Sequence, residues 1–241
     1  MTYPSTISAD DLRAATRPTN SRHSQRAKLS DDRIKELKRR FIDVARSVCP
    51  EFTVYPETRA AINDIFHWCL KLDGPLDPER GLWLWGNIGT GKSTMLAIIR
   101  EFCHQYRGHS HEMSRFYPRG DKLGSPYWFA INNTSDICSD FATNGYSALN
   151  KYVLNGRLAL DDLGAEPRLT GNYSSLINVI QEILHRRYDY RRLNFTHVTT
   201  NLSPDQIAEA YGERVADRCL EMFNFIHYGE YTNRQNPTIN H

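Results

Sequence analysis

A glycine-rich motif at residues 86–93 constrains the fold of this chain more than any other feature. It reads Gly-Asn-Ile-Gly-Thr-Gly-Lys-Ser and matches G-x-x-x-x-G-K-[ST], the phosphate-binding loop. An apolar run at residues 82–85 precedes it, and a stretch with helical character at residues 94–102 follows it. Because such a loop joins a buried strand to a helix, this order predicts an α/β fold built around that strand.

The residue types of the motif explain how it would hold a polyphosphate. Its glycines allow a tight backbone whose N–H groups point at the phosphates, and the following helix directs its positive end at the same anion. Lys92 is expected to contact the β- and γ-phosphates, and Ser93 to hold Mg²⁺. An accidental glycine-rich turn is the alternative. The predicted ATP site comprises Gly86, Asn87, Ile88, Gly89, Thr90, Gly91, Lys92, Ser93 and Thr94.

A second motif, Leu-Ala-Leu-Asp-Asp at residues 158–162, predicts the acidic partner of this loop. Apolar residues that end in two acids are typical of a Walker B strand, which we expect beside the strand of the loop. Asp161 would hold Mg²⁺ opposite Ser93, and Asp162 would orient or deprotonate the attacking water. Glu166 is an alternative for the second role, because many motor ATPases have the longer Glu where Asp162 stands. Two solvated acids in a surface turn are the structural alternative.

Two further polar residues are candidates for sensing the γ-phosphate. Asn201 follows the predicted strand at residues 195–200, where a polar side chain would lie between the acids and the phosphate. Ordinary turn chemistry explains Asn-Leu-Ser-Pro equally well. Arg234, near the C-terminal end, is a possible additional sensor.

Arg214 and Arg218 are neighbours on a helix predicted at residues 212–222. One interpretation is a solvated pair whose charges Asp217 and Glu221 offset. The other is an arginine finger that enters the site of a neighbouring subunit and stabilises charge in the transition state.

Composition divides the chain into three parts. Residues 1–29 are rich in Ser, Thr, Arg and Pro, and we expect a disordered basic arm; residues 30–73 are predicted to form N-terminal helices, and residues 74–241 an ATPase domain. Residues 1–50 hold eleven Lys or Arg against six Asp or Glu, whereas the whole chain carries a net charge of +2. The basic segment predicts either a polyanionic or acidic partner or simply a solvated leader.

Apolar periodicity and turn residues predict alternating strands and helices, as in a parallel α/β sheet. Ser30 and Ser203 are expected to begin helices, and the apolar side chains from Leu176 to Leu184 are expected to mark one long amphipathic helix. A polar insertion is expected at residues 107–125. The predicted strands cover residues 82–85, 127–131, 157–161 and 195–200, and further helices are predicted at residues 57–72, 94–102 and 212–222.

The composition argues against several classes of protein. No apolar run approaches the ~18 residues of a membrane span, and the first residues do not resemble a secretory signal. The five cysteines include no C-x-x-C pair, which favours reduced thiols and a cytoplasmic protein. The histidines near Cys103 lack the spacing of a tetrahedral metal site and are interpreted as polar loop residues: His104, His109 and His111.

Together these motifs resemble the DnaC/IstB group of AAA+ ATPases, the bacterial helicase loaders and transposition helper ATPases. The resemblance covers residues 76–234 and rests mainly on Asp-Asp-Leu-Gly-Ala-Glu-Pro with Thr-Thr-Asn-Leu-Ser, and on Tyr-Gly-Glu-Arg-Val-Ala-Asp-Arg. It implies a P-loop NTPase of the AAA+ type, a three-layer sandwich with a parallel sheet of about five strands and no full C-terminal lid domain. It also implies ATP bound between protomers in a ring or spiral on single-stranded DNA, and it favours Asn201 as a sensor.

The leading hypothesis is an ATP-hydrolysing AAA+ protein that assembles on DNA and loads or remodels a replicative helicase or a transposase. A non-hydrolysing, nucleotide-dependent adaptor and a small-molecule kinase are the alternatives. Contact with DNA is expected mainly by analogy with the family, with local support from the basic residues of 33–40 and from aromatic residues that could stack on bases, Tyr117, Tyr127 and Trp128. The alternative for Tyr127 and Trp128 is that they begin a strand and pack in the core. Neither the basic arm nor the insertion at residues 107–125 follows from the family motifs.

Overall fold

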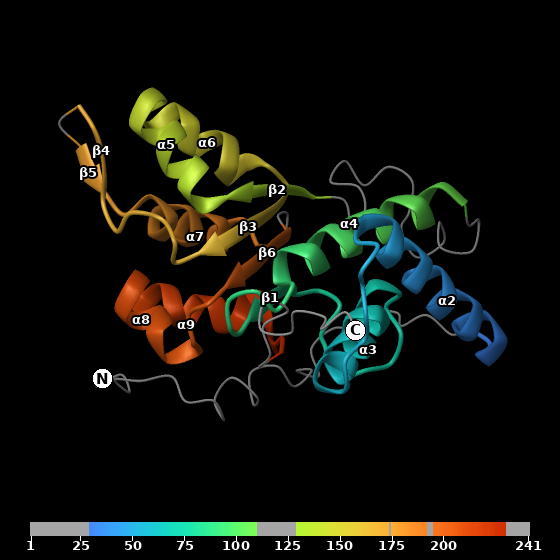
Figure 1. Ribbon diagram of the computed structural model, residues 1–241. Helices are drawn as coiled ribbons and strands as arrows, with labels where there is room; N and C mark the ends of the chain where they lie inside the picture. The colour runs from blue at the N-terminus through green and yellow to red at the C-terminus, as the bar shows by residue number, and fades with distance from the viewer. Residues whose placement is uncertain (1–28, 110–128, 174, 192–194, 230–241) are drawn as a thin grey trace, which may run out of the picture.

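The computed structural model describes residues 29–109, 129–173, 175–191 and 195–229. These residues form a five-stranded parallel sheet with helices on both faces (Figure 1). The sheet has the order β2-β3-β6-β1-β7 and contains β1 (Gly81–Trp85), β2 (Ala130–Asn133), β3 (Arg157–Leu163), β6 (Phe195–Thr200) and β7 (Phe223–His227). The predicted parallel α/β fold with about five strands is therefore confirmed.

Eight helices and a small hairpin surround the sheet in the described part of the chain. The hairpin consists of β4 (Thr170–Asn172) and β5 (Ser175–Ile177). The helices are α2 (Asp31–Val48), α3 (Pro56–Cys69), α4 (Lys92–His109), α5 (Thr134–Asn144), α6 (Tyr146–Leu154), α7 (Val179–Asp189), α8 (Pro204–Tyr211) and α9 (Glu213–Met222). No described helix is both long and apolar enough to cross a bilayer.

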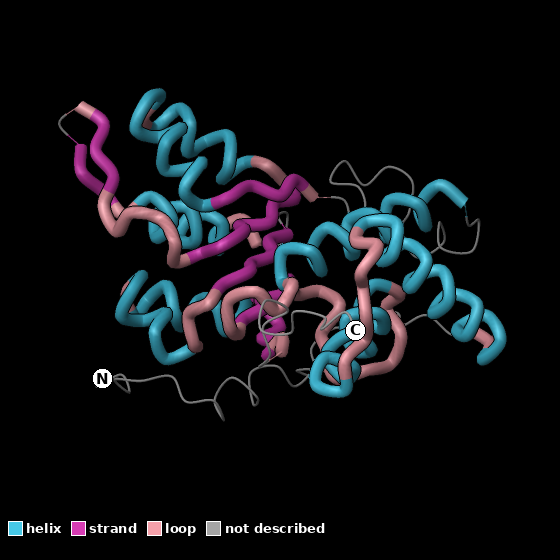
Figure 2. The backbone as a smooth tube through the Cα atoms, in the orientation of Figure 1, coloured by secondary structure: helices cyan, strands magenta, loops and turns pink. Residues whose placement is uncertain are grey.

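Two hydrophobic clusters make the fold a three-layer sandwich. Side chains of β1 alternate between them, so that Leu82 and Leu84 pack with α2, α3 and α4, whereas Trp83 packs with α7 and α9. Figure 2 shows the strands enclosed between these two sets of helices. Phe41 of α2 packs edge-on against Phe66 of α3 and Phe102 of α4, with ring centroids 5.8 and 5.1 Å apart, so the N-terminal helices share one core with α4.

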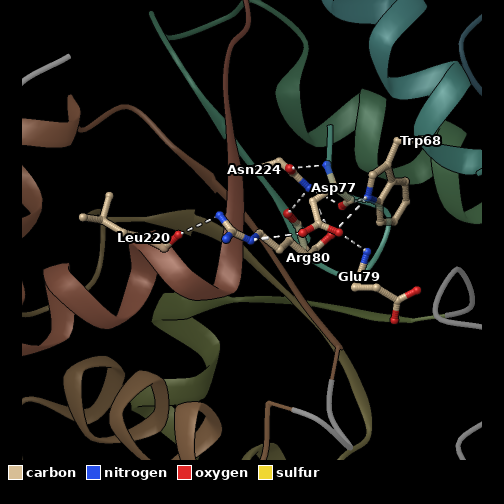
Figure 3. A network of polar contacts seen from close by, with 7 residues as sticks. Trp68, Asp77, Glu79, Arg80, Leu220 and Asn224 are labelled. Carbon is tan, nitrogen blue, oxygen red and sulfur yellow. Dashed lines mark hydrogen bonds and ion pairs between the residues drawn. The ribbon is translucent and has the colours of Figure 1, made fainter. Parts of the chain in front are cut away.

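Buried polar groups also tie α3 to the edge strand β7. Asn224 of β7 is fully buried; its amide oxygen accepts from the Asp77 N–H at 2.8 Å, and its nitrogen donates to the Asp77 carbonyl at 2.8 Å. Trp68 of α3 donates its indole N–H to the carbonyls of Asp77 and Arg80, at 3.2 and 3.0 Å (Figure 3). The loop that leads into β1 is thus held from both sides.

One buried cation lies on the other face of the sheet. Arg187 of α7 has no exposed surface, and its guanidinium donates to five oxygens. These are the Thr196 hydroxyl at 2.8 Å and the carbonyls of Tyr152, Val153, Asn155 and Phe195 at 2.6, 3.3, 2.7 and 3.0 Å. Burial lowers the pKa of Arg187 to about 9, which still leaves it protonated at neutral pH. The side chain therefore joins the end of α6 to the start of β6.

The helix starts predicted at Ser30 and Ser203 are confirmed. The Ser30 hydroxyl accepts from the Arg33 N–H, and Ser203 forms a capping box with Gln206 ahead of α8. The strand predicted at residues 195–200 is confirmed as β6, whereas the strand predicted at residues 127–131 is described only from Ala130 onward.

Two expectations about the elements are wrong. The Walker B strand β3 does not lie beside β1, because β6 is inserted between them. The chain runs from β1 to the edge strand β2 and returns through β3 and β6, an order that sequence adjacency does not reveal. Leu176 does not belong to the long helix: it lies in β5, is 65% exposed, and is separated from α7 by the helix cap Asn178.

Several predictions concern residues outside the described ranges. They include the disordered arm up to residue 28, most of the insertion at residues 107–125, and the individual residues Tyr117, Tyr127, Trp128 and Arg234.

Candidate nucleotide-binding site

The phosphate-binding motif forms the turn between β1 and α4, at the carboxyl edge of the sheet. Gly86, Gly89 and Gly91 have φ values of 145°, 81° and 90°, which side-chain-bearing residues rarely adopt. A Cβ atom at Gly86 would also lie 3.0 Å from the Gly229 carbonyl oxygen and 3.1 Å from that of Tyr228. Of the other predicted loop residues, Asn87, Ile88 and Ser93 are exposed. The sequence therefore adopts the loop conformation that the glycines permit.

Lys92, the first residue of α4, is the central cation of the site. It is 7% exposed, and its ammonium donates to the carbonyls of Gly86 and Asn87 at 2.9 and 2.7 Å and to the Asn201 amide oxygen at 2.8 Å. Burial lowers the pKa of Lys92, while the carboxylates of Asp162 and Asp161 act in the opposite direction. The structure thus brings Lys92 together with Asn201 and both acids.

Thr199 of β6 links the two acids to each other. Its hydroxyl donates to the Asp161 carboxylate at 2.5 Å and accepts from the Asp162 N–H at 2.9 Å. Because β6 lies between β3 and β1, this strand supplies the contact to the acids through Thr199, and Asn201, the residue that follows it, supplies the contact to Lys92.

Asp162 adopts an unusual backbone conformation. Its φ is 61°, in the left-handed region, and the pairing of β3 with β6 shifts register between Leu160 and Leu163. The Thr134 hydroxyl donates to the Asp162 carbonyl at 3.0 Å, so both the carbonyl and the N–H of this residue are held by threonines. Consecutive residues of a regular strand point to opposite faces of the sheet, and the register shift interrupts this alternation at Asp161 and Asp162.

The donors present fit a magnesium ion. Hard oxygen ligands suit Mg²⁺, and the site offers the Asp161 carboxylate together with the exposed Ser93 hydroxyl in the first turn of α4. Near Cys103, His104 is exposed, and in the described ranges no group of three or more His, Cys, Asp or Glu side chains gathers around a common point.

Glu166 is committed to other contacts. One carboxylate oxygen accepts from the Gly164 N–H at 2.8 Å, and the other accepts from the Tyr211 hydroxyl at 2.6 Å. Both oxygens of the Glu166 carboxylate therefore have partners outside the phosphate-binding loop.

The two arginines of α9 differ in their surroundings. Arg218 contacts His185 of α7 through its Nη1, 2.7 Å from Nδ1 and 3.2 Å from the carbonyl, and its guanidinium lies 4.5 Å from the centre of the Tyr188 ring. Arg214 is exposed and makes no side-chain hydrogen bond or ion pair with any described residue. Arg214 is therefore the one of the pair that is available to another molecule.

The predicted basic cluster of α2 is largely paired within its own helix. Arg33 and Arg40 bind Glu36, and Lys35 lies 3.5 Å from Asp32. Lys38 donates to Asn63 of α3, which leaves Arg39 as an exposed cation of this group.

Sequence reasoning missed Thr199 and Thr134 as parts of the site. Thr199 carries a usable signal, since it stands two residues before Asn201 at the end of a strand. Thr134 carries none, because its contact with Asp162 depends on the pairing of β2 with β3.

Comparison with solved structures finds this fold in known proteins. The DnaC helicase loader matches with a TM-score of 0.53 at 19% identity, over 79% of this chain and 99% of its own. DnaI matches with a TM-score of 0.51 at 18% identity, over 80% of this chain and 93% of its own. No protein-family model matches the chain, and no curated protein matches its sequence. The likeness shows the fold, a parallel sheet flanked by helices like that of the DnaC helicase loader, as the resemblance of the motifs predicted.

Proposed function

We propose that this chain, with its DnaC-like AAA+ fold, binds ATP with Mg²⁺ and hydrolyses it. The observation that carries the proposal is the placement of four residues at one edge of the sheet. The Lys92 ammonium binds the Asn201 amide oxygen, and the carboxylates of Asp161 and Asp162 raise the pKa of Lys92 against the effect of its burial. Positive charge, backbone amides and acids in this arrangement suit a triphosphate and the water that attacks it.

Each residue has a distinct part in this mechanism. The loop amides and Lys92 would hold the β- and γ-phosphates, and Asn201, now bonded to Lys92, would contact the γ-phosphate. Asp161 and Ser93 would hold Mg²⁺, which neutralises charge on the phosphates when it is bound. Asp162 would align the water and accept its proton, from a backbone that Thr199 and Thr134 fix in advance.

Replacing Asp162 with asparagine should separate binding from hydrolysis. The amide cannot accept the proton of the water, so we expect hydrolysis to fall by about 10²-fold or more while ATP affinity stays close to that of the wild type. Asparagine also tolerates the left-handed backbone at this position. Single-turnover hydrolysis of labelled ATP with excess protein measures the step directly.

The same experiment distinguishes the second candidate function. A wild-type protein that binds ATP but shows no single-turnover hydrolysis would be the non-hydrolysing adaptor. An Asp162→Asn protein that hydrolyses ATP at the wild-type rate would exclude Asp162 from the role proposed here. Transfer of phosphate to a small molecule would instead support a kinase.

We further propose that copies of the chain assemble in a ring or spiral on single-stranded DNA, with Arg214 of one copy reaching the ATP of the next. The exposure of Arg214 supports this role, whereas Arg218 is engaged by α7 of its own subunit.

The DnaC relative is described as a helicase loader. By analogy we propose a replicative helicase as the protein partner, with a transposase as the alternative.

Contact with DNA through α2 predicts a change in salt dependence. Replacing Lys35, Lys38, Arg39 and Arg40 with glutamine should lower the slope of log affinity against log salt by about 0.7 for each side chain that contacts a phosphate. Fluorescence anisotropy with labelled single-stranded DNA measures this slope, and Lys151→Gln, an exposed lysine on α6, serves as the control. An unchanged slope would move the DNA site away from α2.

A further inference from the structure

The segment that follows the Walker B acids is fastened to the end of α8. Glu166 occupies the turn after β3, and Tyr211 is the last residue of α8. The Tyr211 hydroxyl, on a side chain that is only 2% exposed, donates to Glu166 at 2.6 Å. The second oxygen of Glu166 holds the Gly164 N–H, two residues after Asp162. One carboxylate thus bridges residues 162–166, which we call the catalytic turn, and the end of α8, which lies 45 residues away in sequence.

Two more side chains make the same connection. Arg168 donates to the Glu209 carbonyl at 2.6 Å, and Asn178 donates to the Ala210 carbonyl at 3.2 Å. Carbonyls in the last turn of a helix lack partners within the helix, so these donors satisfy groups that would otherwise face solvent. The end of α8 is therefore fixed at three successive residues by the segment between the catalytic turn and α7.

The end of α8 sets the position of α9. Gly212, with φ of 85°, is both the C-cap of α8 and the N-cap of α9, so no flexible linker separates the two helices. Figure 1 shows α8 and α9 packed side by side, below α5, α6 and α7 on the same face of the sheet. Arg214, two residues beyond Gly212, is exposed in the first turn of α9. A displacement of Tyr211 would therefore displace Arg214.

We propose that Glu166 and Tyr211 form a latch that sets Arg214 according to the conformation of the catalytic turn. Through this latch, the acids at the ATP site of one subunit control the arginine that the same subunit presents to its neighbour. The inference rests on the proposed function and adds a route for coupling between successive sites. Glu166 and Tyr211 are positioning residues here, because neither is proposed to touch ATP.

Removal of the Tyr211 hydroxyl tests the latch. Tyr211→Phe keeps the buried ring, and we expect an unchanged affinity for ATP, a fall of about tenfold in kcat, and a Hill coefficient for ATP close to 1. Glu166→Ala should give the same result without altering the core. Glu166→Gln should keep most of the coupling, because its oxygen can accept from Gly164 while its amide nitrogen donates to the Tyr211 oxygen.

A matched control and a double variant make the test specific. Tyr188→Phe removes a hydroxyl that also joins α7 to α9, through Glu221 on the exposed side, and should leave kcat and cooperativity unchanged. If the latch acts through Arg214, then Tyr211→Phe combined with Arg214→Ala should lose no more activity than Arg214→Ala alone.

Three results would overturn the latch without touching the proposed ATPase. These are wild-type cooperativity in both Tyr211→Phe and Glu166→Ala, additive losses in the double variant, and a Glu166→Gln protein as inactive as Asp162→Asn. The last would show that Glu166 acts on the water. A wild-type protein without ATPase activity would instead overturn the proposed function, and the latch with it.

Discussion

Replacement of Lys92 with alanine is expected to reduce ATP turnover by about 10²–10³-fold or more. The ammonium is the only cation that the described residues bring into the phosphate-binding loop, where it binds the carbonyls of Gly86 and Asn87. Without it, the charge that develops on the γ-phosphate loses its nearest compensation. Steady-state hydrolysis measures the turnover of ATP, and titration with a fluorescent ATP analogue measures the affinity for the nucleotide separately.

The control for this variant is Lys151→Ala, which removes an exposed ammonium that is paired with Asp140 on the surface. It should leave both turnover and affinity unchanged. Circular dichroism would check that the Lys92 variant is folded, since its alanine also deprives Asn201 of a hydrogen bond. Wild-type ATPase activity in a folded Lys92→Ala protein would refute the proposed site.

Replacement of Arg187 with alanine is expected to lower the free energy of unfolding by about 3–5 kcal/mol. Five oxygens would lose their donor at once, and four of them are backbone carbonyls that join the end of α6 to β6. Water cannot easily replace the guanidinium, because the side chain has no exposed surface. Urea denaturation, followed by circular dichroism, measures the loss.

The adjacent Arg186 provides a control on the same helix. It is partly exposed and pairs with Glu182 one turn earlier, so Arg186→Ala should cost less than about 0.5 kcal/mol. Arg187→Lys should give an intermediate loss, since a single ammonium cannot serve acceptors on two sides of the site. Equal stabilities for the Arg187→Ala and Arg186→Ala proteins would show that the buried hydrogen bonds contribute little.

The elements that the sequence predicted well carry local signals. Glycines mark the loop after β1, apolar residues and acids mark β3, and serine caps mark the starts of α2 and α8. The strand β7 was missed because it follows α9 directly, with Phe223 as the helix cap and no turn residue between them. The order of the strands was also missed, since it depends on crossover connections that leave no mark in the sequence.

Within the site, residue identities could be predicted but their arrangement could not. Lys92, Asp161, Asp162 and Asn201 belong to motifs with fixed spacing, and the roles given to them remain predictions for experiment. The left-handed backbone of Asp162 could not be foreseen, because nothing in an Asp-Asp pair indicates a bulge. The contacts of Glu166 and Arg218 depend on which helices pack together, and tertiary structure alone decides that.

The position of β6 has a consequence for how this protein can evolve. Thr199 binds the acids and Asn201 binds Lys92, so a single short stretch of chain supports the opposing charges of the site. Inserting or deleting one residue within β6 would turn Thr199 toward the opposite face of the sheet and would shift Asn201, which follows the strand, in the same step. We therefore expect this strand to tolerate substitutions better than changes of length, which loops at the periphery of the molecule can absorb.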